Sequence, residues 1–230
     1  MSRGSDDFYA GAGTGRWVGI SGIVAAVLIV AGVLLGGNTP EYDAPDAEWL
    51  QWFDKDSNTN AALLGALVLV VGALALIVFA TGLAARFRAA GGQRGNAALI
   101  AGAGVACGVC FIVGGILANA IAAAIAFDSD YPIPAPDVAK ALEQAGIGIV
   151  LVGAGWAAAL LVAVVSFSAR RTGQLPSWLT AAGMVVAVLL LASIIFVPLV
   201  LLPLWALVTG IVLLREGPAS SVSPGPAAMR

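Results

Sequence analysis

Histidine is absent from the 230 residues, and charged residues make up only 10% of them. Without histidine the chain lacks the most common metal ligand and the most common general base. A soluble domain carries about 25% charged residues, so this chain cannot cover itself with a water-facing surface. We therefore expect lipid to be its main solvent, in agreement with a mean hydropathy of +0.98.

Ionisable side chains are also missing from the interior of every long apolar stretch. A charged group at the centre of a bilayer costs about 2.5–3.5 kcal/mol even on permissive insertion scales, so proton-coupled carriers and voltage sensors keep such groups for function. Neither a Gly-x-Ser-x-Gly nor an HExxH spacing is present. No catalytic set, metal site or cofactor is predicted, and the lack of a basic run argues against nucleic acid as a partner.

Cysteine is nearly absent as well, because Cys107 and Cys110 are the only two. They form a C-x-x-C pair inside an apolar stretch, which leaves two interpretations open: a membrane thiol-redox pair or two small packing residues. We favour packing, since an apolar environment suppresses the reactive thiolate. Quinone-linked thiol oxidoreductases also carry a second cysteine pair, which this chain lacks.

Long apolar runs are what the chain does contain, and about 20 such residues cross the ~30 Å hydrocarbon core of a bilayer. The last run holds Pro198, where we expect a hairpin turn; five spans plus a re-entrant piece is the alternative. Residues 1–16 and 215–230 are expected to be disordered. The sequence thus predicts an all-α transmembrane bundle with six spans: residues 17–36, 61–84, 97–127, 146–169, 178–196 and 199–214.

The basic residues predict the orientation of this bundle. Lys55 and Lys140 lie in the predicted outer loops, residues 37–60 and 128–145, whereas the other nine of the 11 basic residues are arginines on the opposite side. Basic residues concentrate on the cytoplasmic side of membrane proteins. We therefore expect both termini in the cytoplasm, in a multi-pass protein of a bacterial plasma membrane.

Two short polar segments are predicted to begin helices outside the bilayer. Ala44-Pro45-Asp46 and Ala135-Pro136-Asp137 each follow an apolar span and precede a polar helical stretch. Proline is favoured in the first turn of a helix, and Asp43 is positioned to cap the first one.

The first of these helices is amphipathic. Its aromatic residues recur at i, i+3 and i+4 and are predicted to contact the outer leaflet; they are Trp49, Trp52 and Phe53. The loop around them carries six carboxylates, at Glu41, Asp43, Asp46, Glu48, Asp54 and Asp56. A solvated acidic loop is the simplest interpretation, and a docking surface for a protein partner is the alternative.

The third span carries a stripe of small residues. Gly104, Gly108 and Gly115 are spaced to let another helix approach closely, while Ile112 is expected to face lipid. Asn119 would be costly in lipid, so we expect it to bond to a neighbouring helix or, alternatively, to line a path for a solute.

The N-terminal part of the chain, residues 1–95, resembles a broad set of multi-pass membrane proteins of GC-rich actinobacteria that have no agreed activity. The features that carry the resemblance are Gly36-Gly37-Asn38-Thr39-Pro40, the acidic Trp-bearing segment 46–53 and Arg86-Phe87-Arg88. The resemblance implies a multi-pass fold and transfers no functional residue.

Three function hypotheses follow from these observations. The first is a non-catalytic scaffold or accessory subunit, with the bilayer and a protein at the acidic outer loop as partners. The second is a carrier or channel for a neutral or apolar solute, using Asn119, Ser166 and Ser193. The third is a thiol-redox protein that uses the cysteine pair.

Overall fold

The computed structural model describes residues 14–128, 130–195 and 197–215, and every regular element within them is helical. The predicted all-α fold class is therefore confirmed. The ends predicted to be disordered lie almost wholly outside the described residues, since the first helix begins at Thr14 and the last one ends at Arg215.

Nine α-helices occur in the described residues. The long ones are α1 (Thr14–Gly36), α3 (Asp56–Ala89), α4 (Arg94–Ala118), α7 (Gly155–Thr172) and α9 (Leu201–Arg215). The shorter ones are α2 (Asp46–Phe53), α5 (Ala120–Phe127), α6 (Pro136–Gly148) and α8 (Ser177–Leu190). A π-helical stretch, η2 (Ile149–Ala154), joins α6 to α7, and two 3-10 turns, η3 (Ser193–Ile195) and η4 (Val197–Val200), lie between α8 and α9.

Five helices of the described chain are long and apolar enough to cross a membrane. They are Arg16–Gly36, Asp56–Ala89, Arg94–Ala118, Pro136–Thr172 and Pro198–Arg215. The helix Ser177–Leu190 is also apolar but shorter. At a rise of 1.5 Å per residue, the 34 residues of α3 reach about 51 Å, well beyond a hydrocarbon core of ~30 Å. A helix of this length must project from the bilayer or tilt within it.

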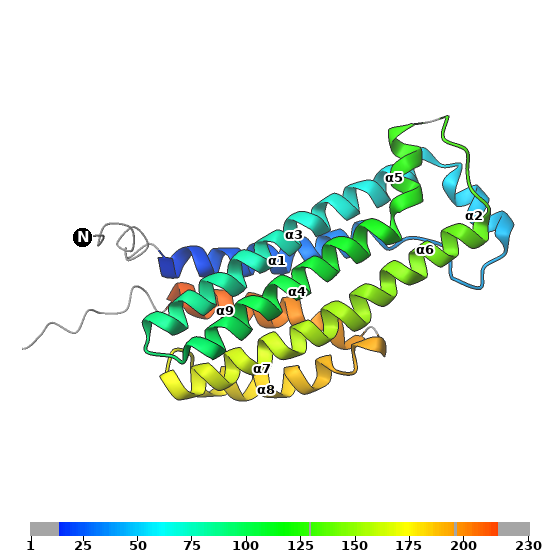
Figure 1. Ribbon diagram of the computed structural model, residues 1–230. Helices are drawn as coiled ribbons and strands as arrows, with labels where there is room; N and C mark the ends of the chain where they lie inside the picture. Colours follow the sequence, from blue (N-terminus) through cyan, green and yellow to red (C-terminus); the bar gives the residue numbers. More distant parts are fainter. Residues whose placement is uncertain (1–13, 129, 196, 216–230) are drawn as a thin grey trace, which may run out of the picture.

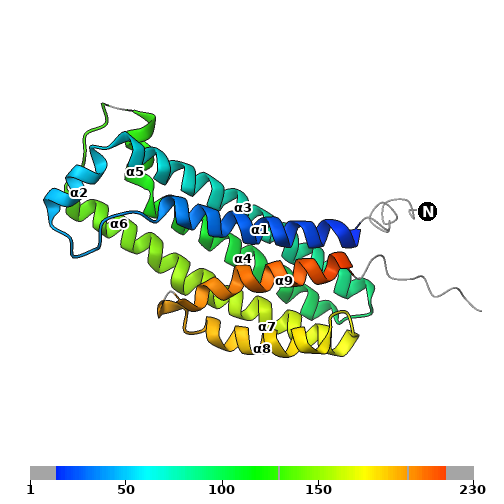
Figure 2. The same ribbon diagram turned by 180° about the vertical axis from the view of Figure 1, so that it is seen from behind.

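The helices form one elongated bundle. In Figures 1 and 2, α1, α3, α4 and the continuous α6–α7 helix run side by side, while α8 lies along α7 and α9 along α1. At one end, which we call the arginine end, α1 begins and α9 ends, and the connections 90–93 and 173–176 lie there too. At the other, the acidic end, α2 and α5 lie beside the start of α6.

Several predicted span boundaries are wrong. The span predicted for 97–127 is two helices, because α4 ends at Ala118 and α5 begins at Ala120. The polar helix predicted to follow Ala135-Pro136-Asp137 is confirmed as α6, but it continues through η2 into α7, so the span predicted to begin at 146 is part of a helix that begins at Pro136. Hydropathy locates the apolar part of a helix, whereas polar and largely exposed turns, such as those at Asp56 and Asp137, extend the helix beyond that part.

Glycine sets how closely the helices approach. A Cβ atom added at Gly65 of α3 would lie 2.5 Å from the backbone nitrogen of Gly36 in α1. One added at Gly146 of α6 would lie 2.5 Å from the nitrogen of Ala118 and from the carbonyl oxygen of Gly114, both in α4. These backbones touch, and close packing of small residues is the main attraction between helices in lipid.

The predicted glycine stripe of α4 lies inside the protein, against α3. A Cβ added at Gly108 would lie 2.5 Å from Ile77 Cγ1, and one added at Gly115 would lie 2.6 Å from Leu69 Cδ2. A Cβ at Gly104 would meet that of Ala80. All three stripe positions are buried in this contact.

Ile112, which was expected to face lipid, is half-buried and packs against the core. The reason is that α4 is covered on two faces, by α3 and by the α6–α7 helix. Val113 is the more exposed neighbour, at 48%.

Two glycines of α6 provide a matched test of this packing. A Cβ at Gly146 meets the backbone of α4, whereas one at Gly148 meets nothing within 4 Å. We predict that Gly146→Ala lowers the free energy of unfolding by about 1–3 kcal/mol through overpacking. Gly148→Ala should leave it unchanged or raise it by up to about 1 kcal/mol, since alanine is the better helix former. Thermal unfolding in detergent measures both, and equal effects of the two substitutions would contradict the contact.

Candidate functional site

The acidic end is closed by a structure that we call the cap: α2, α5 and the first half of α6. Pro45 precedes α2 with φ −56°, and Asp46 and Glu48 lie in its first turn, where carboxylates interact favourably with the helix dipole. The prediction that Asp43 caps this helix is wrong, because Pro45 occupies the N-cap position and no side-chain capping bond forms. Asp43 lies in the turn before it.

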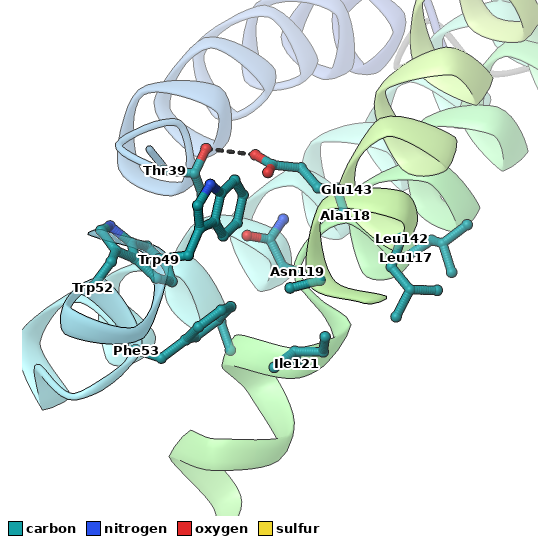
Figure 3. Close-up of a pocket in the computed structure, with 12 residues that line it drawn as sticks. Thr39, Trp49, Trp52, Phe53, Leu117, Ala118, Asn119, Ile121, Leu142 and Glu143 are labelled. Carbon is teal, nitrogen blue, oxygen red and sulfur yellow. Dashed lines mark hydrogen bonds between the residues drawn. The ribbon is translucent and has the colours of Figure 1, made fainter. Parts of the chain in front are cut away.

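The aromatic face of α2 points into the protein (Figure 3). Trp49 is 2% exposed and Phe53 is 5% exposed, and both pack with Ile121 of α5 and Ala139 of α6. Trp52 is half-buried, with its ring edge-on to Phe53 at 5.1 Å between centroids. The prediction of outer-leaflet contacts is therefore wrong for Trp49 and Phe53. Their helical spacing correctly indicated one apolar face, but α5 and α6 cover that face in place of lipid.

Hydrogen bonds hold the cap to residues 37–45, the segment that connects α1 to α2. Trp52 Nε1 donates to the carbonyl of Asn38 at 2.7 Å, and Trp49 Nε1 donates to the carbonyl of Glu41 at 3.3 Å. From α6, Lys140 Nζ donates to the carbonyl of Ala44 at 3.0 Å and pairs with Asp46 at 2.9 Å. The Asp46 side chain is 61% exposed, so the pair is expected to add little stability. Its main effect is to position α2 over α6.

Glu143 is the buried carboxyl group of the cap. The residue is 7% exposed, and its Oε1 accepts a hydrogen bond of 2.5 Å from the hydroxyl of Thr39 (Figure 3). The two residues are far apart in sequence, so this bond ties α6 directly to the segment that leaves α1. A buried carboxyl group without such a donor is costly, which makes Thr39 the residue that allows Glu143 to lie there.

Asn119 separates α4 from α5, with φ −108° and ψ 11°. Its side-chain amide donates to the carbonyl of Gly115 in its own helix at 2.9 Å. The expected bond to a neighbouring helix is therefore not the one formed. Local bonding of this kind competes with helix continuation, and α5 turns away from the axis of α4 here (Figure 1).

A small cavity lies where Thr39, Asn119 and Glu143 meet the aromatic face of α2 (Figure 3). Its volume is about 10 Å³, which is close to the minimum for one water molecule. Three polar side chains from different parts of the chain border it. The cavity can hold one water molecule hydrogen-bonded to these side chains, and it is too small for an organic substrate.

The cysteine pair faces the π-helical stretch. Cys107 is fully buried, and its thiol donates to the carbonyl of Ala154 at 3.4 Å. A Cβ added at Gly153 would lie 2.8 Å from Cys110 Sγ. Ser193 donates to another carbonyl of the same stretch, that of Leu151, at 2.5 Å. The π-helix interrupts the regular α-helical bonding, and side chains of two neighbouring elements bond to its backbone.

Sequence reasoning missed Thr39 and Glu143 as a pair. The burial of Glu143 could have been predicted, because it shares a helical face with Ala139 and Gly146, which are also buried. Nothing in the sequence indicates the role of Thr39, since it lies in an irregular segment and its partner is distant in sequence.

The chain matches no known family model, and neither a curated protein nor a solved structure is detectably similar to it.

The Thr39–Glu143 bond can be tested with a matched threonine. We predict that Thr39→Val lowers the free energy of unfolding by about 1–3 kcal/mol, because the buried carboxyl group loses its donor. In Thr81→Val, the hydroxyl removed is exposed and bonds only to carbonyls of its own helix, so a change within about 0.5 kcal/mol is expected. Chemical unfolding in detergent measures both. If the two valine substitutions cost the same, Thr39 does not support Glu143.

Proposed function

We propose that this chain crosses the plasma membrane of a bacterium six times, with both termini in the cytoplasm. The hairpin of α8 and α9 supports the sixth crossing. The 14 residues of α8 reach about 21 Å, and the following 3-10 turns, at about 2 Å per residue, extend the segment toward the far side of the core. The first helix, α1, begins at the arginine end, and the last helix, α9, ends there. This arrangement also fits an even number of crossings.

We further propose that the protein is a non-catalytic accessory subunit or scaffold that binds a partner through the cap. The observation that carries this proposal is the two-sided character of α2. Its aromatic side chains are anchored inside the cap, while Glu48, Asp54 and Asp56 on and beside it are exposed. Exposed Lys55 lies between Asp54 and Asp56, so the net charge of this surface is negative. A rigid element with net negative charge suits a partner with a basic surface, since complementary charge steers and selects association.

A carrier for a neutral or apolar solute is the alternative. It would use Asn119, Ser166 and Ser193, but these groups take part in helix contacts. Ser193 bonds to the π-helical stretch, Asn119 bonds within α4, and Ser166 lies where a Cβ on Gly183 would meet it. A thiol-redox role for Cys107 and Cys110 remains a third hypothesis.

Charge reversal on the cap tests the accessory-subunit proposal. We predict that the full chain, extracted from its own membrane in mild detergent, migrates with a partner in native gels. Replacing Glu48 and Asp54 with lysine should release that partner, because two attractive charges become repulsive.

The matched control is the lysine substitution of Asp128 and Asp130, which are exposed at the same end but outside α2. This control should keep the complex. A wild-type chain that migrates alone, or equal loss in both double variants, would contradict the proposal. Solute uptake by liposomes that contain only this protein would favour the carrier.

A further inference from the structure

A second and larger cavity lies at the arginine end, on the opposite side of the bundle from the cap. Its volume is about 190 Å³, far more than the 10–15 Å³ that one water molecule requires. The end of α3, the connection 90–93, the start of α4 and the end of α7 enclose it, and polar side chains dominate two of these walls. Those side chains are Gln93, Asn96, Ser168, Arg171 and Thr172.

Hydrogen-bond donors line this cavity. Ser168 is 4% exposed, and its hydroxyl oxygen accepts a bond of 3.3 Å from the amide of Asn96. Among the described residues nothing accepts the proton of that hydroxyl. The helix α4 begins at Arg94 beside the cavity, and the N-cap residue Gln93 makes no side-chain capping bond. The backbone N–H groups of the first turn therefore remain available, as at any uncapped helix start.

The charge around the cavity is positive. Arg171 lines it, and the guanidinium carbon lies 4.2 Å from the centre of the Phe167 ring. This stacking restricts the conformations of the Arg171 side chain. Within the described residues, no carboxylate pairs with Arg171. Every acidic residue in the described part of the chain lies at the acidic end. An anion in the cavity would thus meet donors and positive charge, with no carboxylate of the described residues competing for them.

We propose that this cavity binds a phosphate group, with Arg171, Asn96 and Ser168 as its side-chain ligands. Arginine presents a planar fork of donors that matches phosphate oxygens, and the amide and hydroxyl add further donors. The same chemistry is carried by an anionic lipid headgroup and by free phosphate. The exposed Phe167, at 45%, places apolar surface beside the cavity and favours the lipid.

Lipid titration of the purified full chain tests the proposal. Native mass spectrometry in detergent would compare phosphatidylglycerol with diacylglycerol, which lacks the phosphate, and thermal unfolding in phosphate-free buffer would test inorganic phosphate. Arg171→Gln should weaken binding of the phosphate-bearing probe about tenfold or more, the loss expected for a charged hydrogen bond. Asn96→Asp, which keeps the shape and adds a negative charge, should weaken it by a similar factor.

Arg170→Gln is the matched control, because Arg170 is the adjacent exposed arginine and does not line the cavity. It should change binding by less than about twofold, because Arg170 lies outside the cavity, whereas Arg171, which is exposed as well, lines it. Selective loss in the Arg171 and Asn96 variants supports the site, and the probe that responds identifies lipid or free phosphate as the source. Equal loss in the Arg170 and Arg171 variants would overturn it, as would no binding of either probe by the wild-type chain.

Discussion

The separation of charge along the chain is the constraint on which the rest of the structure depends. Both lysines and ten of the 13 acids lie within residues 41–56 and 128–143, whereas the arginines lie in or beside the other connections and the terminal segments. Within the described residues, the bundle brings the acids and lysines to one end and the arginines to the other, so that the helices between the two ends carry only apolar and small polar side chains. Lipid tolerates such a surface, whereas water does not. Exposed residues such as Leu67, Val71 and Val78, each more than half exposed, are therefore expected where the helices meet the bilayer.

In lipid the hydrophobic effect does not drive helices together, so the stability of the bundle depends on close packing between helices. Glycine allows this close packing at three contacts: α1 with α3 at Gly65, α4 with α6 at Gly146, and α1 with α9 at Gly19 and Gly210. The cap is built differently. Trp49 and Phe53 form a small aromatic core there, and the bond between Thr39 and Glu143 joins segments that are far apart in sequence. Two kinds of packing thus match two solvents, lipid along the bundle and water at its end.

Much of this fold could be predicted from the sequence, because apolar run length and glycine spacing are local signals. The Ala-Pro-Asp segments at 44–46 and 135–137 mark the starts of α2 and α6, and the stripe through Gly108 packs as its spacing indicates. The break at Asn119 was missed, since an alanine-rich apolar run continues beyond it and hydropathy does not register a local amide bond. The cap was misjudged for a different reason. A helical face of Trp and Phe suits lipid and protein equally, and only tertiary contacts decide between them.

Cysteine accessibility tests the central claim, a bundle with its acidic end outside and its arginine end in the cytoplasm. In a Cys107→Ala, Cys110→Ala background, single cysteines would replace Ser57 at the acidic end, Ser177 at the arginine end and Arg215 at the end of α9, all of which are exposed. A membrane-impermeant maleimide applied to intact cells should label only the cysteine at 57, and the other two should react only after the membrane is opened. Labelling of 215 but not 177 in intact cells would mean five crossings. Labelling of 177 but not 57 would reverse the orientation and contradict the account.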